Sequence, residues 1–503
     1  MQGARFANFA NLGSLGSVGS IGRRLVVPFS LFIFMGCNAQ GSDTGAGGSS
    51  GSTTGVAGSS GGSSGSPSGN GGGGSGVGTA GAGGMGVAGA AGGAAGAGAA
   101  GMGGSGGGAF ACPTLPIPGT CTVPADLRCP YPKLSQTGCI DANPFSDPKV
   151  AIKMASSVVP YEVNSPLWSD SALKSRGFKL PAGGKIHVKD CAKNPNECKV
   201  PDLNTGACCA PTGDDGKWVF PAGTVMVKNF YFADTSRPTG YKIVETRLLV
   251  HFDKVVQLQG VNTEWVGYGY QWNDDQTDAT IIGTLVDGSD TGVSATFNVK
   301  PTAQITWNYP SRNDCITCHM PITPTTMPSG GFTIGPETAQ MNRIPTGDTM
   351  NQIDKFAAAG LFDATISKPY KAALVTPYPG QAGTFPVGTT VDQRARSYLH
   401  ANCSFCHRPD GKFSAFDLRN DIPFASTNVC NTPPGKGDLG VTNATILTPK
   451  MPGSSLIWLR MHAPKTDPNV GETGRMPEIG SWAVDDQGTK LISDWITSIT
   501  ACP

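Results

Sequence analysis

Residues 41–109 restrict the fold of this 503-residue chain more than any other feature, because they are almost wholly Gly, Ser, Ala and Thr. Such a segment cannot bury enough apolar surface to offset the entropy lost on ordering. We therefore expect residues 38–109 to form a flexible tether, whose ends lie roughly 45–50 Å apart on average. The folded part is confined to about 390 residues after the tether, enough for two or three domains.

The first 37 residues resemble an export signal. Arg23 and Arg24 provide the charged region, and LVVPFSLFIF provides an apolar run too short to span a bilayer comfortably. The run ends at Gly36-Cys37, which resembles a bacterial lipobox. The resemblance implies cleavage before Cys37 and lipidation of its thiol. An ordinary signal peptide with a chance cysteine is the alternative.

The net charge and the hydropathy of the chain limit the kinds of partner that it can be expected to bind. The formal net charge is +1, so there is no electrostatic case for a nucleic acid or for an acidic partner. No run of 18 or more apolar residues follows the signal. We expect contact with a membrane through the lipid anchor only.

Two Cys-x-x-Cys-His motifs lie in the second half of the chain. They comprise Cys315, Cys318 and His319 in PSRNDCITCHMP, and Cys403, Cys406 and His407 in YLHANCSFCHRPDG. Cysteines three apart on a helical turn share one face and can both reach one porphyrin edge, and the next residue can turn its imidazole to the iron. A four-thiolate zinc cage is the strongest rival, and a redox-active disulfide is a weaker one, but neither requires the adjacent histidine. We predict two covalently attached haem c groups, with His319 and His407 as iron ligands.

The ten cysteines left after Cys37 and the two motifs form an even set. They are Cys112, Cys121, Cys129, Cys139, Cys191, Cys198, Cys208, Cys209, Cys430 and Cys502. An even set in an exported chain favours up to five disulfides. A zinc site within 191–209 is the alternative, but an oxidising compartment disfavours free thiols.

Residues 161–310 have the pattern of short antiparallel strands. Apolar side chains alternate in YKIVETRLLVHF and EWVGYGYQW, and turn sequences such as DGSD separate the runs. We expect a β-sandwich or jelly-roll-like domain, with the aromatic stripe of EWVGYGYQW in its core rather than around a cofactor.

After Pro310 the pattern becomes helical. We predict helices over 390–407, 454–462 and 485–499, separated by loops rich in Pro and Gly. The predicted fold is therefore α+β and multidomain: an antiparallel β-sandwich followed by a mainly α-helical c-type cytochrome region with two haems.

A loop methionine, Met476 in GETGRMPEIG, is the predicted distal ligand of the second haem, because a thioether is soft and suits haem iron. Simple packing of that side chain is the alternative. The first haem has no such loop; its candidates are Met327, Met341, Met350 and His251, and none is preferred, so an open position is possible. His400, two turns before His407, can lie between the haems, contact the other haem or simply pack. Arg312 is a candidate partner for a haem propionate; an ordinary surface arginine is the alternative.

Residues 391–503 resemble a class I cytochrome c domain, with an opening helix bearing CSFCH, the loop RMP and the closing helix TKLISDWITSI. The resemblance implies that the first and last helices pack together. Residues from about 161 to 503 resemble an uncharacterised family of bacterial dihaem c-type cytochromes, often lipoproteins, in phrases such as YEVNSPLWSDSALKSR and FPAGTVMVKNFYF.

These expectations divide the chain into six segments: 1–37, signal peptide; 38–109, tether; 110–160, a lead-in rich in Cys and Pro; 161–310, sandwich; 311–390, first haem; and 391–503, second haem. The expected function is a lipid-anchored dihaem cytochrome, at the periplasm or cell surface, that passes single electrons between redox partners of the cell envelope. A haem enzyme (peroxidase or small-molecule oxidase) with an open first iron, and a surface-binding module with auxiliary haems, are the alternatives. The sequence does not decide which membrane holds the anchor.

Overall fold

The structure is a computed structural model that describes residues 131–141, 154–200, 210–211, 215–258, 261–282, 293–298, 304–319, 333–380, 384–409, 411–413, 415–463 and 474–503. The predicted signal peptide, the lipobox Cys37 and the tether lie outside these ranges, as do Cys112, Cys121, Cys129, Cys208 and Cys209. Within the described ranges, no helix has the length and apolar character needed to cross a membrane.

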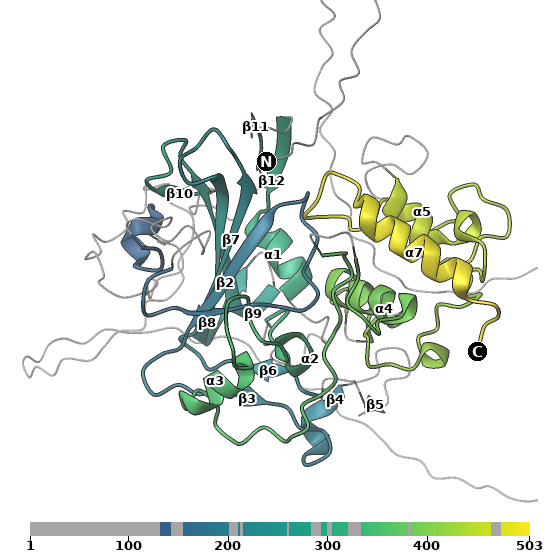
Figure 1. Ribbon diagram of the computed structural model, residues 1–503, viewed down its shortest axis with the longest axis horizontal. Coiled ribbons are helices and arrows are strands. Elements are labelled where there is room, and N and C mark those ends of the chain that lie inside the picture. The colour runs from purple at the N-terminus through teal and green to yellow at the C-terminus, as the bar shows by residue number, and fades with distance from the viewer. Residues whose placement is uncertain are drawn as a thin grey trace, which may run out of the picture. The chain divides into compact units, whose positions relative to one another are not determined.

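The central element is a six-stranded antiparallel sheet in the order β1-β2-β7-β8-β9-β10 (Figure 1). Its strands are β1 (Val159–Tyr161), β2 (Leu173–Lys179), β7 (Val225–Ala233), β8 (Tyr241–Leu258), β9 (Val261–Trp272) and β10 (Ala279–Ile281). The alternating runs YKIVETRLLVHF and EWVGYGYQW form the paired strands β8 and β9, so these two strand predictions are confirmed.

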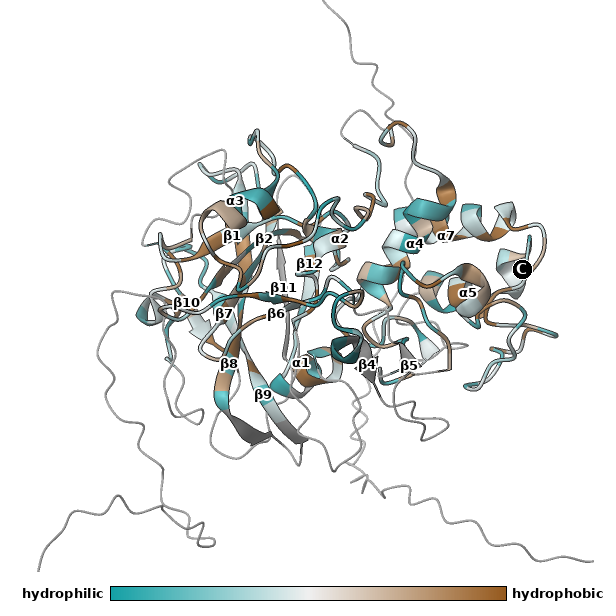
Figure 2. Cartoon of the chain, turned by 90° about the horizontal axis from the view of Figure 1, so that it is seen from below, coloured by the Kyte–Doolittle hydropathy of each residue, from teal (hydrophilic) through white to brown (hydrophobic). Residues whose placement is uncertain are grey.

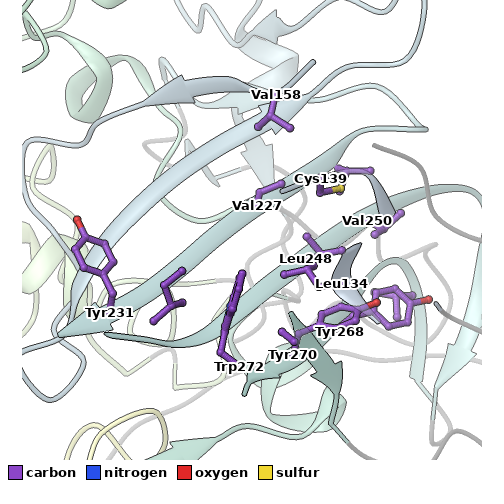
Figure 3. Close-up of a cluster of buried hydrophobic side chains, with 14 residues drawn as sticks. Leu134, Cys139, Val158, Val227, Tyr231, Leu248, Val250, Tyr268, Tyr270 and Trp272 are labelled. Atoms are coloured by element: carbon purple, nitrogen blue, oxygen red, sulfur yellow. The ribbon is translucent and has the colours of Figure 1, made fainter. Parts of the chain in front are cut away.

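One face of this sheet carries the larger apolar core. Val266, Tyr268, Tyr270 and Trp272 of β9 are buried there with Leu248 of β8, beneath η1 (Leu134–Thr137), a 3-10 helix (Figure 3). Because side chains alternate between the faces of a strand, the glycines of GYGY point to the other face. The prediction that the aromatic stripe is core is confirmed.

The opposite face is covered by short elements. Phe178 and Met226 of the sheet pack with residues of α2 (Thr338–Met341) and α3 (Gln352–Ala358), while Phe230 packs against Trp307. Trp307 belongs to β12 (Gln304–Tyr309), which pairs with β11 (Val293–Asn298) in a separate ribbon. Two further ribbons join β3 (His187–Val188) to β6 (Trp218–Val219) and β4 (Lys199–Val200) to β5 (Ala210–Pro211), and η2 (Pro195–Cys198) lies beside them in sequence.

The predicted fold class, an antiparallel β-sandwich followed by a mainly α-helical cytochrome region, is wrong. The described residues form one six-stranded sheet with two-stranded ribbons, and a sandwich is not confirmed. After β12 the helices are short: α1 (Arg312–His319), α2, α3, α4 (Val391–Asn402), α5 (Leu456–His462) and α7 (Asp486–Ser498), with the 3-10 turns η3 (Phe424–Ser426) and η4 (Pro452–Ser454). Strands and irregular segments outweigh helices in the described chain, so the later part is not a mainly α-helical region.

The sequence between α4 and α5 explains the shortage of helix. Asn428, Asn431, Leu439, Asn443 and Lys450 all have positive φ. A left-handed residue interrupts the ladder of a right-handed helix, and Asn tolerates that conformation better than most residues. The segment therefore forms successive turns, and composition alone did not reveal how much of the chain they occupy.

The individual helices after residue 390 are close to those predicted. Thr390 caps α4, its side chain accepting from the Gln393 N–H, and the Asp485 side chain caps α7. α4, α5 and α7 lie side by side in both views (Figures 1 and 2), and α4 packs on α7 as the class I resemblance implied. The helix predicted over 390–407 is shorter, because turns replace it after Asn402.

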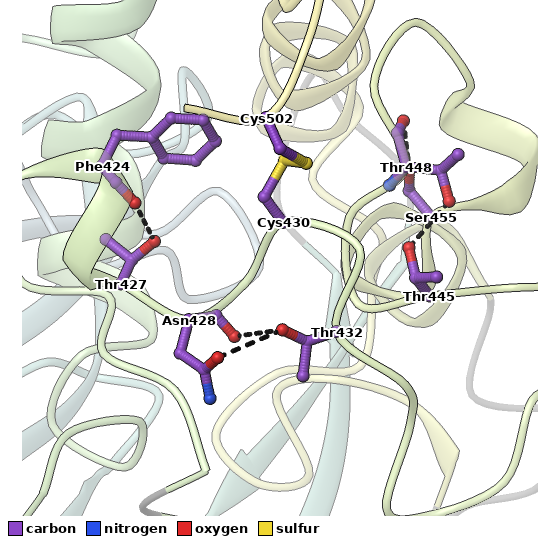
Figure 4. Close-up of a disulfide and its surroundings, with 9 residues drawn as sticks. All are labelled: Phe424, Thr427, Asn428, Cys430, Thr432, Thr445, Thr448, Ser455 and Cys502. Atoms are coloured by element: carbon purple, nitrogen blue, oxygen red, sulfur yellow. Dashed lines mark hydrogen bonds between the residues drawn. A yellow bond between two sulfur atoms is a disulfide. The ribbon is translucent and has the colours of Figure 1, made fainter.

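A disulfide between Cys430 and Cys502 ties the segment after α7 to the turns that follow α4 (Figure 4). Cys139 and Cys191 are also disulfide-bonded. Four of the ten candidate disulfide cysteines are thus disulfide-bonded in the structure. The side chain of Cys198 lies outside the described set.

Candidate functional site

The first Cys-x-x-Cys-His motif lies on α1, the helix that directly follows β12 in the chain. Ser311 begins the helix: its backbone N–H donates to Asp314 Oδ2 at 2.9 Å, and its Oγ accepts from the Asp314 N–H at 3.1 Å. α1 lies directly on β9, and a Cβ placed on Gly267 would lie 2.7 Å from the Sγ of Cys315. Only a glycine leaves room for the motif helix at this point.

Cys315, Cys318 and His319 all line a cavity of about 230 Å³ between α1, the sheet and the turn after α4. The sheet contributes Arg176, Lys228 and Arg247, side chains that the sequence analysis did not single out. Burial lowers the pKa of Arg176 and brings the pKa of Lys228 well below its usual value. Arg247 differs, because burial lowers its pKa but the neighbouring Glu245 carboxylate outweighs this and raises it overall.

Three of the four candidate distal ligands lie away from the first cavity. Met341 is fully buried among α2 and α3, and Met350 is 49% exposed. His251 is held by hydrogen bonds, its Nδ1 lying 2.9 Å from the Phe220 carbonyl oxygen, and its ring stacks on Trp265. Met327 lies outside the described residues. Arg312, the candidate propionate partner, is not among the residues that line the cavity.

His400 does line the first cavity, so it faces the other motif rather than its own. Its Nδ1 accepts the Asn420 N–H at 3.0 Å, and its Nε2 lies 2.8 Å from a carboxylate oxygen of Glu337. An iron-bound histidine donates through its free ring nitrogen, whereas here Nδ1 accepts and Nε2 donates. In this arrangement His400 forms a carboxylate–imidazole pair in the cavity wall.

The second motif follows α4 in a tight turn, where the N–H groups of Cys406 and His407 both donate to the Cys403 carbonyl, at 3.1 and 3.0 Å. Its three side chains line a smaller cavity of about 70 Å³, together with Met476, the predicted distal ligand, and a second methionine, Met461.

His407 is fixed by aromatic rings in this second cavity. Its imidazole stacks on Phe416 with ring centroids 4.4 Å apart. Burial lowers its pKa to about 4, so the ring is neutral and keeps a lone pair that can bind a metal.

The two cavities share a wall. Trp168, Cys318, Phe405, Pro477 and Ile479 line both of them. The thiols of Cys318 and Cys406 are hydrogen-bonded to each other, which raises the pKa of Cys318 and lowers that of Cys406. The structure thus brings together Cys318 and Cys406, which lie 88 residues apart in the sequence (406 − 318).

The loop between β1 and β2 holds this wall in place. The Ser165 hydroxyl donates to the Ser397 carbonyl of α4 at 2.9 Å, and the Trp168 N–H donates to Asn402 Oδ1 at 2.6 Å. The Asp170 carboxylate accepts from the N–H groups of Trp482 and Ala483, in each case at 2.8 Å. This loop is the phrase NSPLWSD, for which the sequence offered no chemistry, since its contacts lie 175 or more residues away.

Polar groups in each cavity have unused hydrogen-bonding capacity. In the shared wall, the indole N–H of Trp168 is buried and has no hydrogen-bond partner within the described residues; the same holds for Nε of the buried Arg475 in the second cavity. Both are donors that an acceptor in the cavity would satisfy. Two thiols, a neighbouring imidazole and free donors per cavity fit a covalently attached porphyrin that carries carboxylates.

The zinc alternative is not supported. The described residues include all four motif cysteines, yet no group of three or more His, Cys, Asp or Glu side chains among them could hold a metal ion. Cys315 lines only the first cavity, Cys403 and Cys406 line only the second, and Cys318 lines both.

The chain matches no protein-family model, no curated protein and no solved structure, so the two cavities and their residues carry the functional argument alone.

Proposed function

We propose that this chain is an exported, lipid-anchored dihaem c-type cytochrome that carries single electrons between redox partners in the cell envelope, and that it belongs with the dihaem cytochromes it resembles. One observation carries the proposal: each Cys-x-x-Cys-His motif has all three of its side chains on one cavity, and the two cavities share a wall that includes Cys318.

In this proposal Cys315 and Cys318 attach the first haem and His319 binds its iron. Cys403, Cys406 and His407 do the same for the second, with Met476 as its distal ligand. Haem iron supplies reversible one-electron exchange, and Met/His ligation raises its reduction potential.

The protein's own residues serve such transfer in two ways. The stacked Phe416 and His407 and the buried core of α4, α5 and α7 give the second region a largely apolar surrounding. The contact between Cys318 and Cys406 places the two attachment points side by side, which favours a short path from one haem to the other.

The test is peptide mass spectrometry of the full chain, produced in a host with haem-attachment machinery. We expect one haem on the Cys315–Cys318 peptide and one on the Cys403–Cys406 peptide. Replacing Cys403 and Cys406 by Ala should leave a single haem, whereas Cys430→Ala with Cys502→Ala, the matched control, should keep both. A disulfide joining Cys318 to Cys406 in place of haem would contradict the proposal.

A second candidate, a haem enzyme acting at the first iron, is favoured by the Glu337–His400 pair, since an acid/base group beside an open iron is what such chemistry needs. Burial raises the pKa of Glu337, but His400 and nearby lysines outweigh this and lower it overall. Tight binding of carbon monoxide to one of the two reduced haems would support this candidate, and its absence would favour simple electron transfer.

A further inference from the structure

Three cations stand in a row across the sheet at the first cavity. In the strand register Arg176 of β2 lies opposite Lys228 of β7, and Lys228 lies opposite Arg247 of β8. The next residue in the row, on β9, is Gly269. Like charges directly opposite each other destabilise a sheet, so this arrangement is costly unless something neutralises it.

The protein neutralises only one end of the row. Arg247 donates from Nε and Nη2 to the Glu245 carboxylate, at 2.7 and 2.8 Å. Arg176 and Lys228 make no hydrogen bond or ion pair with any described residue. The Nζ of Lys228 lies over the Phe230 ring, 5.0 Å from its centroid.

The acidic side chains of the cavity wall are already engaged. Asp314 accepts from Ser311 at the start of α1, and Glu337 is paired with His400. The carboxylates of Glu162 and Glu245 act on these side chains only from a distance, so Arg176 and Lys228 face the cavity without a directly bonded anion from the described chain. A buried charge without a direct partner is strongly unfavourable.

The position of the two cations along the row indicates which anion would meet them. Cys315, the first cysteine of the motif, lies over β9 at Gly267. Neighbouring strands are about 4.8 Å apart, so β2 lies roughly 14 Å across the sheet from β9. A porphyrin carries its propionates on the edge opposite its vinyl groups, so a haem attached over β9 extends its carboxylates away from the cysteines.

We propose that Arg176 and Lys228 form the carboxylate-binding site of the first cavity, and that they hold the propionates of the haem attached at Cys315 and Cys318. This inference rests on the proposed function. The same two cations would also bind a free carboxylate, and the experiment separates the two sources.

The experiment compares the full haem-loaded chain with Arg176→Met plus Lys228→Met. Lys179→Met is the control, because it removes one positive charge from the opposite face of β2. The exchange of Arg176→Lys with Lys228→Arg keeps both charges and controls for altered packing. Haem content is measured first, and then both reduction potentials, by optical redox titration with and without added acetate.

We expect two haems in every variant. Loss of two positive charges favours the ferric state, so the double Met variant should shift one haem's redox equilibrium at least tenfold toward ferric, about 59 mV for one electron. The control and the charge-keeping exchange should retain both potentials, and acetate should change none of them, because the propionates fill the site.

Unchanged potentials in the double Met variant would overturn the proposal. Saturable binding of acetate to the unsubstituted chain, lost in the double Met variant, would overturn the propionate assignment in favour of a free carboxylate. A chain without haem would overturn the proposed function, and this inference with it.

Discussion

The two cavities hold the same motif but are built in different ways. The first lies on a β-sheet: residues from β2, β7, β8 and β9 line it, and its charged side chains come from strands far apart in sequence. The second lies among α4, α5 and α7, and its motif, its methionines and its aromatic partners all come from residues 398–489 apart from the shared wall. A local site can be found from a local pattern, whereas a site assembled by strand register cannot.

The charges differ in the same way. The first cavity has two cations without a described partner, and the second is lined mainly by apolar and aromatic side chains. Charge next to haem and the identity of its axial ligands are two of the means by which a protein sets a reduction potential. We expect the two haems to have distinct potentials, the first set mainly by charge and the second by Met476.

The largest expected effect comes from adding one methyl group at Gly267, which should remove the first haem and leave the second. Gly267→Ala would place a Cβ 2.7 Å from Cys315 Sγ and 2.9 Å from Cys315 Cβ, so α1 must move. Overpacking of this kind costs about 1–3 kcal/mol. We expect the purified chain to lose the first haem and keep the second, as measured by haem content per chain.

Gly269→Ala is the control, two residues away on the same face of β9. Its Cβ would meet its nearest atom, Ile282 Cδ1, at 3.3 Å, compared with 2.7 Å at Gly267. Two haems in both variants would mean that α1 does not need the close approach at Gly267.

Removal of the Cys430–Cys502 disulfide should affect the second region alone. The bond closes a loop with a sequence separation of 72, and loss of a disulfide costs about 2–4 kcal/mol. In the chain with both cysteines replaced by Ser, urea should release the second haem's ligands at a lower concentration while the midpoint at the first haem stays in place. Equal shifts at the two haems would show that the two regions unfold as one unit.

A smaller effect tests which methionine serves the second iron. Met476→Ala should lower the potential of the second haem so that its redox equilibrium changes at least tenfold, about 59 mV. Met461→Leu, a volume-conserving change in the same cavity, should leave the potential unchanged. The reverse outcome would make Met461 the ligand.

Sequence and structure agree where the signal is local. The helix predicted from Thr390 does begin there as α4, and the alternation in β8 and β9 identifies a buried face. The spacing of each Cys-x-x-Cys-His motif places its three side chains on one cavity. These features depend on neighbours within a few residues, which a sequence shows directly.

Sequence reasoning failed where the site is formed by segments that lie far apart in the sequence. Arg176 and Lys228 looked like ordinary strand residues, and only the pairing of β2 with β7 sets them side by side. Trp168 lies in the wall between the two cavities and bonds to Asn402 of α4, a contact that no local sequence pattern predicts. The mainly α-helical prediction failed because helix signals at three places were extended over the turns between them.

The most direct test of the account is a pyridine haemochrome count on the purified chain, made in a host that attaches haem. The account predicts two covalent haems per chain, one for each cavity. A chain without covalent haem that binds zinc in stoichiometric amount would contradict it and would leave a disulfide-bonded binding protein.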